Sequence, residues 1–438
     1  MNSAELTSSA YDQLTPRAVD RERVLGYIRC LRGPGGVESG EIRFAGEAAL
    51  RPVAFFGHSP RLVAPEGFDE VLAEVQVGRS RTPLVGVRDG TVEVLFPFFK
   101  WERTLLGESY FSHAQPLFSR LPLPYTVIPF SMRAHLLRLS RRLSARGLDA
   151  RGFPAWPVDV TLDRMRRCIW TAAARLAGIP AQPLADQRLV LTHDLDEGFG
   201  IPGIERLRRV EREFGYRSAF GILSHRYHVE ASLLDSLVAE GCEVFSHGYL
   251  HDGRLPYLPA AELDHRLSHI LTRFPGLREQ IRGFRAGQLV RSDRLYRHVA
   301  RHFRYDLTPS HSERGGPHGA VSGCGTLHPF LGSGGLVHVP LTMPQDYYLV
   351  FVGGAGPGRT LAAWQQALDI IWSEGGVAVM NVHPDNVLRI PWLLDVYRHF
   401  LEQVAESGAE VLTPWEVVER AYPTLLDSRR AEHQLQPR

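Results

Sequence analysis

The stretch Leu189-Val190-Leu191-Thr192-His193-Asp194-Leu195-Asp196-Glu197 is a short apolar run that ends in two aspartates one residue apart. A near-continuous apolar run of this kind is typical of a buried parallel strand whose carboxyl end opens on a site. Residues i and i+2 of a strand point to the same side, so Asp194 and Asp196 can face one cavity together. Two carboxylates in one cavity repel, so a metal ion or another cation must hold one of them ionised. Alone, such a stretch is more often a turn with solvated carboxylates, and the residues downstream decide between the two.

From residue 185 onward, short apolar runs alternate with helical patterns, which is typical of repeated βα units. Close to eight strands joined by helices favour a barrel over an open sheet, and the catalytic groups of such barrels collect at the carboxyl ends of the strands. We predict strands at 188–194, 217–223, 242–247, 281–285, 304–308, 336–342, 376–383 and 409–413, and helices at 204–214, 231–239, 260–274, 293–303, 362–373 and 392–407.

The residues before this alternation predict a separate, smaller α+β domain. The apolar runs 83–87 and 91–96 are joined by Asp89-Gly90, a strong hairpin signal, and 162–176 has a helical pattern. A chain of 438 residues is long for one domain. We therefore predict an N-terminal α+β domain at 1–184, a barrel domain at 185–425 and a polar C-terminal tail at 426–438.

The composition is that of an ordinary soluble globular protein. The chain has 50 Lys+Arg against 48 Asp+Glu, a formal charge of +2, which argues against a nucleic-acid partner. The four cysteines are too dispersed for a Cys-x-x-Cys metal or redox motif. Residues 1–32 carry no apolar signal-like run, and no apolar stretch reaches about 18 residues. We expect a cytoplasmic protein with no membrane span.

Two histidines follow the third predicted strand of the barrel half. His247 and His251 lie four residues apart in Ser246-His247-Gly248-Tyr249-Leu250-His251, so one helical turn can bring both to one ion. The spacing alone is weak evidence in a chain with 19 histidines. Together with the Asp-x-Asp pair at an equivalent strand end, it predicts a metal site of two histidines and one carboxylate. Such a set leaves coordination positions open for water and substrate.

Two more polar residues follow predicted strand ends. Arg285, in Gly283-Phe284-Arg285, places a cation at the same rim, where it could hold a neighbouring carboxylate ionised and oriented. His383 follows the strand at 376–383, and a histidine there is suited to proton donation near neutral pH. Taken singly, a surface salt bridge and a structural histidine are the commoner explanations.

In this order, Asp194 and Asp196, His247 with His251, Arg285, and His383 resemble the motifs of the polysaccharide deacetylase family, also called carbohydrate esterase family 4. The resemblance covers about residues 190–415, and its most specific part is the run from Ser246 to His251. Leu195 separates the two aspartates, His193 replaces the family's phenylalanine, and Asn381 stands where the family prefers leucine. The branch of the family that uses Asp-x-Asp includes members that act on peptidoglycan-like or cyclic amide substrates.

The resemblance implies a distorted (β/α) barrel of about seven strands that binds a divalent metal. Asp196, His247 and His251 would be the metal ligands, with zinc as the first choice of ion, and Asp194 would be the general base that activates water.

The resemblance also implies the remaining catalytic roles. Arg285 would orient Asp194, His383 would protonate the departing amine, and Asp306 would support His383.

We therefore expect a metal-dependent amide hydrolase that N-deacetylates an acetamido sugar or a sugar-containing intermediate. A hydrolase of cyclic imides or amides with the same fold is an alternative. So are a carbohydrate-binding protein without turnover and a non-haem Fe(II) oxygenase, since two histidines and a carboxylate also suit iron. The expected partner is a small molecule or glycan with an N-acyl group, and an oligomer is compatible with the sequence.

Overall fold

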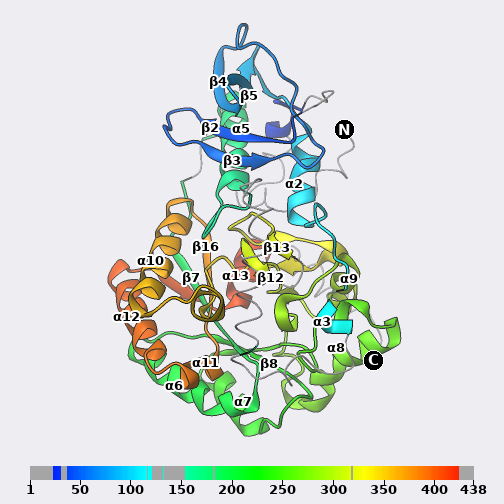
Figure 1. Cartoon of the computed structure of the whole chain (residues 1–438), viewed down its shortest axis with the longest axis vertical. Coiled ribbons are helices and arrows are strands. Elements are labelled where there is room, and N and C mark those ends of the chain that lie inside the picture. Colours follow the sequence, from blue (N-terminus) through cyan, green and yellow to red (C-terminus); the bar gives the residue numbers. More distant parts are fainter. Residues whose placement is uncertain are drawn as a thin grey trace.

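The computed structural model describes residues 23–30, 37–115, 117–120, 132, 153–180, 183–316 and 319–423. The predicted tail at 426–438 lies outside these residues. Two large sheets occupy opposite ends of the longest axis of the molecule (Figure 1). The smaller is formed by residues 28–94 and the larger by residues 188–412. The chain thus forms separate sheets before and after the predicted boundary near residue 184, while the boundary itself stays a prediction.

The N-terminal sheet has six strands in the order β1-β6-β5-β4-β2-β3. The predicted hairpin is present, since β5 and β6 pair antiparallel, with Asp89 and Gly90 at φ 49° and 67° in the turn. Helices α2 and α5 pack against this sheet, whereas α3 lies beside α8 (Ala260–Arg273) and α9 (Asp293–His302) of the barrel (Figure 1). The elements are β1 (Ile28–Cys30), β2 (Ser39–Phe44), β3 (Arg51–Ala54), β4 (Glu70–Val77), β5 (Ser80–Arg88), β6 (Thr91–Val94), α2 (Phe98–Leu106), α3 (Leu117–Arg120) and α5 (Thr161–Leu176).

Seven parallel strands form the core of the larger sheet, in the order β15-β11-β10-β9-β8-β7-β16. β14 (Phe330–Leu331) pairs antiparallel at the β15 edge, β17 (Glu410–Leu412) pairs with the first half of β7, and β12 (Glu313–Gly316) and β13 (Gly319–Ser322) form a separate hairpin. The seven strands are β7 (Arg188–Leu195), β8 (Ala219–Ile222), β9 (Glu243–Ser246), β10 (Gly283–Phe284), β11 (Tyr305–Asp306), β15 (Val337–His338) and β16 (Val377–Asn381).

The chain after β15 closes this sheet onto β16. Met343 N donates to Val379 O at 3.0 Å. Thr342 Oγ1 donates to Val377 O at 2.8 Å and accepts from Val379 N at 2.7 Å. A threonine side chain thus completes the ladder where regular strand pairing stops. The prediction of a distorted barrel of about seven strands is confirmed, and the eighth predicted strand, β17, is an addition to β7.

Helices lie on the outside of the barrel (Figure 1). They are amphipathic, and their apolar faces pack on strands that are buried along their whole length, such as β16. Within the described part of the chain, no helix combines the length and apolar character needed to cross a bilayer. The helices are α6 (Ile201–Glu213), α7 (Ala231–Ala239), α8 (Ala260–Arg273), α9 (Asp293–His302), α10 (Pro357–Ser373), α11 (Pro384–Arg389), α12 (Leu393–Ser407) and α13 (Pro414–Ala421).

Buried polar contacts join the N-terminal half to the barrel. Arg291, which is fully buried, pairs with Glu108, and Tyr110 Oη donates to Gly323 O at 2.7 Å. The segment after α2 continues down the barrel, where Tyr257 Oη donates to His113 O at 3.1 Å. Tyr257 follows the loop that carries His251. The segment before the barrel therefore contacts the side of the barrel on which the predicted site lies.

Candidate metal centre and active site

The predicted site residues all lie at the carboxyl ends of barrel strands. Asp194 is the penultimate residue of β7 and Asp196 follows its end. His247 follows β9, Arg285 follows β10, and Asp306 ends β11. His383 lies two residues beyond β16. Because parallel strands carry these ends to one rim, residues 189 positions apart in the sequence become neighbours.

Asp196, His247 and His251 form a cluster with the spacing of metal ligands. Asp196 Oδ1 lies 3.1 Å from His247 Nε2 and 3.2 Å from His251 Nε2. Donor atoms about 2.0–2.2 Å from a tetrahedral zinc ion lie about 3.3–3.6 Å from one another, so the two distances from Asp196 are close to those of ligands that share one ion. Among the described residues, this is the one group of three or more His, Cys, Asp or Glu side chains that converges in this way.

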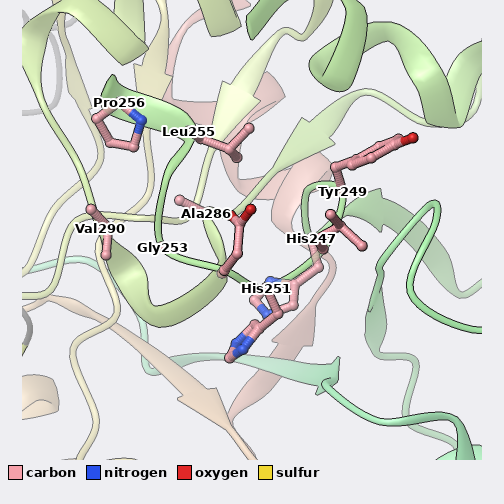
Figure 2. A pocket seen from close by; sticks show the side chains of 11 residues that line it. His247, Tyr249, His251, Gly253, Leu255, Pro256, Ala286 and Val290 are labelled. Carbon is pink, nitrogen blue, oxygen red and sulfur yellow. The ribbon is translucent and has the colours of Figure 1, made fainter. Parts of the chain in front are cut away.

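The two histidines come from one loop with an unusual backbone. His251 has a φ of 55°, in the left-handed region that residues other than glycine rarely adopt. Such strain persists where the surroundings enforce it, and it is commonest at functional sites. Gly287 allows the close approach, because a Cβ there would lie 2.7 Å from the His251 ring. Figure 2 shows both imidazoles on one side of this loop, with Tyr249 pointing away from them.

The surroundings of the two imidazoles fit a metal. His247 Nδ1 is buried without a hydrogen-bond partner and lies 3.6 Å from Asp194 Oδ1, the position of the carboxylate that orients a metal-bound histidine. Burial is the main cause that lowers the pKa of His251 to about 4, so this imidazole is neutral, as a ligand must be. His251 Nε2 also accepts a long 3.2 Å bond from Gln288 N, which a cation would displace.

Asp194 is buried and held on both oxygens. Arg285 Nη1 donates to Oδ1 at 3.0 Å, and Asn381 Nδ2 donates to Oδ2 at 2.9 Å. Burial alone would raise the pKa of Asp194, but Arg285 and His247 outweigh it and hold the pKa below its usual value. Gly221 on β8 leaves room for this carboxylate, since a Cβ there would lie 2.7 Å from Oδ1. Asp194 is therefore an ionised, oriented carboxylate beside the predicted metal ligands.

Arg285 is completely buried, and each of its three guanidinium nitrogens donates to a group of the site. Besides Asp194, its guanidinium donates to Leu307 O at 3.1 Å and to Thr192 Oγ1 at 3.0 and 3.1 Å. Its guanidinium also lies 5.3 Å from the centre of the Phe245 ring. The prediction that Arg285 lies against one of the aspartates agrees with this geometry.

The partner of His383 is Asp346, a residue that the sequence analysis missed. His383 Nδ1 donates to Asp346 Oδ1 at 2.6 Å, and His383 N donates to Oδ2 at 3.0 Å. Burial opposes a charge on this imidazole, but Asp346 outweighs burial and raises the pKa of His383 to about 10. His383 is therefore protonated at neutral pH and presents Nε2 to the site. Asp346 follows the predicted strand 336–342 at the rim, so the rule that found the other site residues could have found it.

Asp306, predicted to support His383, has other partners. It accepts hydrogen bonds from Thr308 N at 3.2 Å, from Thr308 Oγ1, and from His338 Nδ1 at 2.9 Å. Thr308 Oγ1 in turn accepts from Ala286 N at 2.9 Å. The prediction is wrong because β15 lies between β11 and the closing edge at β16. Asp306 instead fixes the backbone next to Arg285.

The site thus combines three kinds of group within one buried rim. It has a neutral imidazole and a carboxylate at metal-ligand spacing, an ionised carboxylate beside them, and a protonated imidazole opposite. An ionised carboxylate can accept a proton and an imidazolium can donate one, so the arrangement supports acid–base chemistry next to a cation.

No protein-family model and no curated protein matches this chain. Solved structures do match. A protein assigned as a polysaccharide deacetylase from Mycobacterium smegmatis is 19% identical, with 59% of this chain and 95% of that chain covered and a TM-score of 0.41. One with the same assignment from Pseudomonas aeruginosa PAO1 is 15% identical, with 57% and 96% covered and a TM-score of 0.44. A PuuE allantoinase is 14% identical, with 56% and 93% covered and a TM-score of 0.44. Polysaccharide deacetylases, the family that the sequence motifs resemble, are thus among the solved structures that this chain matches.

Proposed function

We propose that this chain is a metal-dependent amide hydrolase that removes an N-acyl group from an acetamido sugar or a sugar-containing intermediate. The observation that carries the proposal is that an ionised Asp194 and a protonated His383 both contact the amide nitrogen of Asn381, next to the Asp196, His247 and His251 cluster.

The three ligand residues would hold a divalent cation, with zinc as our first choice. When bound, such a cation acidifies a water molecule and polarises a carbonyl oxygen. Zinc suits a set of two imidazoles and one carboxylate with open positions.

The chain's own residues supply the proton transfers. Asp194 accepts the proton of the attacking water, and Arg285 keeps its carboxylate ionised and aimed. His383 donates its Nε2 proton to the nitrogen of the breaking C–N bond, because an amine leaves poorly unless it is protonated. Asp346 holds the imidazole so that Nε2, rather than Nδ1, faces the site.

A pure binding protein has no use for a buried base and a buried acid facing one another. We therefore favour turnover over binding alone. A cytoplasmic location remains part of this proposal, and it favours a soluble or carrier-linked substrate over an extracellular polymer.

The decisive experiment is hydrolysis by purified protein after metal analysis. We expect acetate or a new amine to be released from at least one N-acetylated sugar or cyclic imide, activity to be lost with a chelator, and activity to return with Zn²⁺. Asp194→Asn should abolish hydrolysis and leave metal content intact, whereas Asp196→Asn should remove both.

Asp264→Asn is the matched control. Asp264 contacts His298 Nδ1 at 2.8 Å and His302 Nε2 at 3.2 Å between α8 and α9, but these three residues lack the mutual spacing of metal ligands. Loss of this carboxylate should leave metal content and activity unchanged. A wild-type protein that binds metal and hydrolyses none of the amides would refute the proposal.

A further inference from the structure

Asn381 lies between the proposed base and the proposed acid. It is the last residue of β16 and is completely buried. Its Nδ2 lies 2.9 Å from Asp194 Oδ2, 3.3 Å from Gln345 Oε1 and 3.4 Å from His383 Nε2. One amide group therefore contacts both residues that would move protons in hydrolysis.

The amide cannot serve all three partners at once, because Nδ2 carries two hydrogens. Asp194 Oδ2 is the closest partner and an ionised acceptor, so it takes one N–H. The second N–H can donate either to Gln345 Oε1 or to His383 Nε2, but not to both. An imidazole nitrogen accepts only when it carries no proton, so protonated His383 leaves this N–H to Gln345.

Neighbouring residues on one loop hold this arrangement. Gln345 contacts Asn381, and Asp346, the next residue, holds His383. The loop follows Met343, whose N–H joins β16 at Val379 O. The amide is therefore placed by the same backbone that places the acid, and its distances to both partners are set by barrel closure.

We propose that Asn381 is a positioning residue that contacts both the base and the acid. Its amide donates an N–H to His383 Nε2 once this nitrogen has given up its proton. This inference rests on the proposed function. The proton moves from Nε2 to the nitrogen of the breaking C–N bond, and that nitrogen keeps the electron pair of the bond. The second N–H of Asn381 then turns from Gln345 to the emptied lone pair on Nε2. Asn381 itself gains and loses no proton, and its other N–H keeps Asp194 in place throughout.

The test compares the full-length wild type with Asn381→Leu and Asn381→Asp. Leucine is close to asparagine in size, and aspartate has the same shape as asparagine. Neither side chain has an N–H to donate. We expect kcat to fall on the order of 100-fold, with KM within about threefold, because a misplaced acid or base affects the transition state more than substrate binding. Asp264→Asn is again the control: it removes a carboxylate that contacts His298 and His302 between α8 and α9, away from Asn381, and should change kcat little.

A second measurement needs no substrate. Ring signals of ¹⁵N-histidine-labelled protein are followed between pH 7 and 11, and those of His383 are identified by their loss in His383→Gln. Losing an N–H that stabilises neutral Nε2 should move the His383 titration upward by about 0.4–1 pH unit in Asn381→Leu. The carboxylates that interact with His383 are the same in both proteins: Asp346, Asp194, Asp196 and Asp385.

The two measurements separate the inference from the proposed function. An unmoved His383 titration, or a kcat of Asn381→Leu within threefold of wild type, overturns the inference. A moved titration in a protein that hydrolyses no amide supports the link between Asn381 and His383 while refuting the proposed function.

Discussion

Replacing Asp346 by asparagine should convert His383 from an imidazolium into a neutral imidazole. Asp346 is completely buried and accepts both the ring N–H and the backbone N–H of His383. Asparagine has the same shape, and its oxygen can still accept from Nδ1, so the orientation of the ring should persist. What is lost is the negative charge that holds the proton on the ring, together with the oxygen that accepts from His383 N and from Asn386 Nδ2.

The size of the effect follows from the pKa of His383, which burial lowers and Asp346 raises to about 10. Without that charge, the pKa should return toward the ordinary histidine value of about 6.5. The protonated fraction at pH 8 then falls from nearly complete to about 3%, and at pH 6 it stays near about 75%. We therefore expect kcat to fall about 30-fold at pH 8 and less than about twofold at pH 6. A bound cation would lower the pKa in both proteins and leave the direction of the difference unchanged.

The assay is a pH profile of kcat for wild type and Asp346→Asn, with the His383 ring titrated by NMR. Because the folded pKa is raised, the ion pair stabilises the fold fully below about pH 6.5 and loses this contribution as the pH rises through about 10. Urea unfolding should therefore show the largest difference between the two proteins near pH 6. A loss of kcat that is the same at pH 6 and pH 8 would contradict the role of Asp346 as the charge that keeps the acid protonated.

Three further outcomes follow from the site. Zn²⁺ at 100 times its dissociation constant should stabilise the wild type by about 2.7 kcal/mol in thermal unfolding, and a similar shift in Asp196→Asn would refute the ligand assignment. Arg285→Met leaves Asp194 as an uncompensated buried charge and should cost about 3–5 kcal/mol in urea unfolding; a loss below about 1 kcal/mol would contradict the buried pair. Burial opposes ionisation of Glu211, but His193 outweighs it and the pKa of Glu211 is lowered to about 2, so its stabilisation is present above about pH 4.5 and is lost as the pH falls through 2. In Glu211→Gln, the free energy of unfolding should fall less steeply as the pH drops below about 4.5. The same fall as in wild type would contradict the stabilising role of Glu211.

The alternation of strands and helices in the barrel was predictable, because its strands are short and apolar and its helices are amphipathic. All eight predicted strands and all six predicted helices of the barrel half have counterparts in the structure, and α7 matches residue for residue. The convergence of Asp196, His247 and His251 was also predictable, since parallel strands end at one rim.

The order of strands around the barrel was harder to predict, and the error at Asp306 arises there. Asp306 and Asp346 both follow strand ends, but only the chain before Asp346 closes onto β16, through Met343. Closure depends on a backbone bond and on the hydroxyl of Thr342, neither of which leaves a periodic pattern in the sequence. The contacts of Asn381 depend on the same closure.

The inserted Leu195 explains how two aspartates one residue apart can serve one site. Leu195 ends β7 and is completely buried among the side chains of the apolar cluster that includes Ile204 and Phe220. Side chains alternate along a strand, so anchoring Leu195 in this core turns Asp194 to the opposite face, toward Arg285. Asp196 lies one residue past the strand end and reaches the two imidazoles. Because residues i and i+2 of a strand share one side, the alternation that buries Leu195 brings the proposed base and the proposed ligand to the same side.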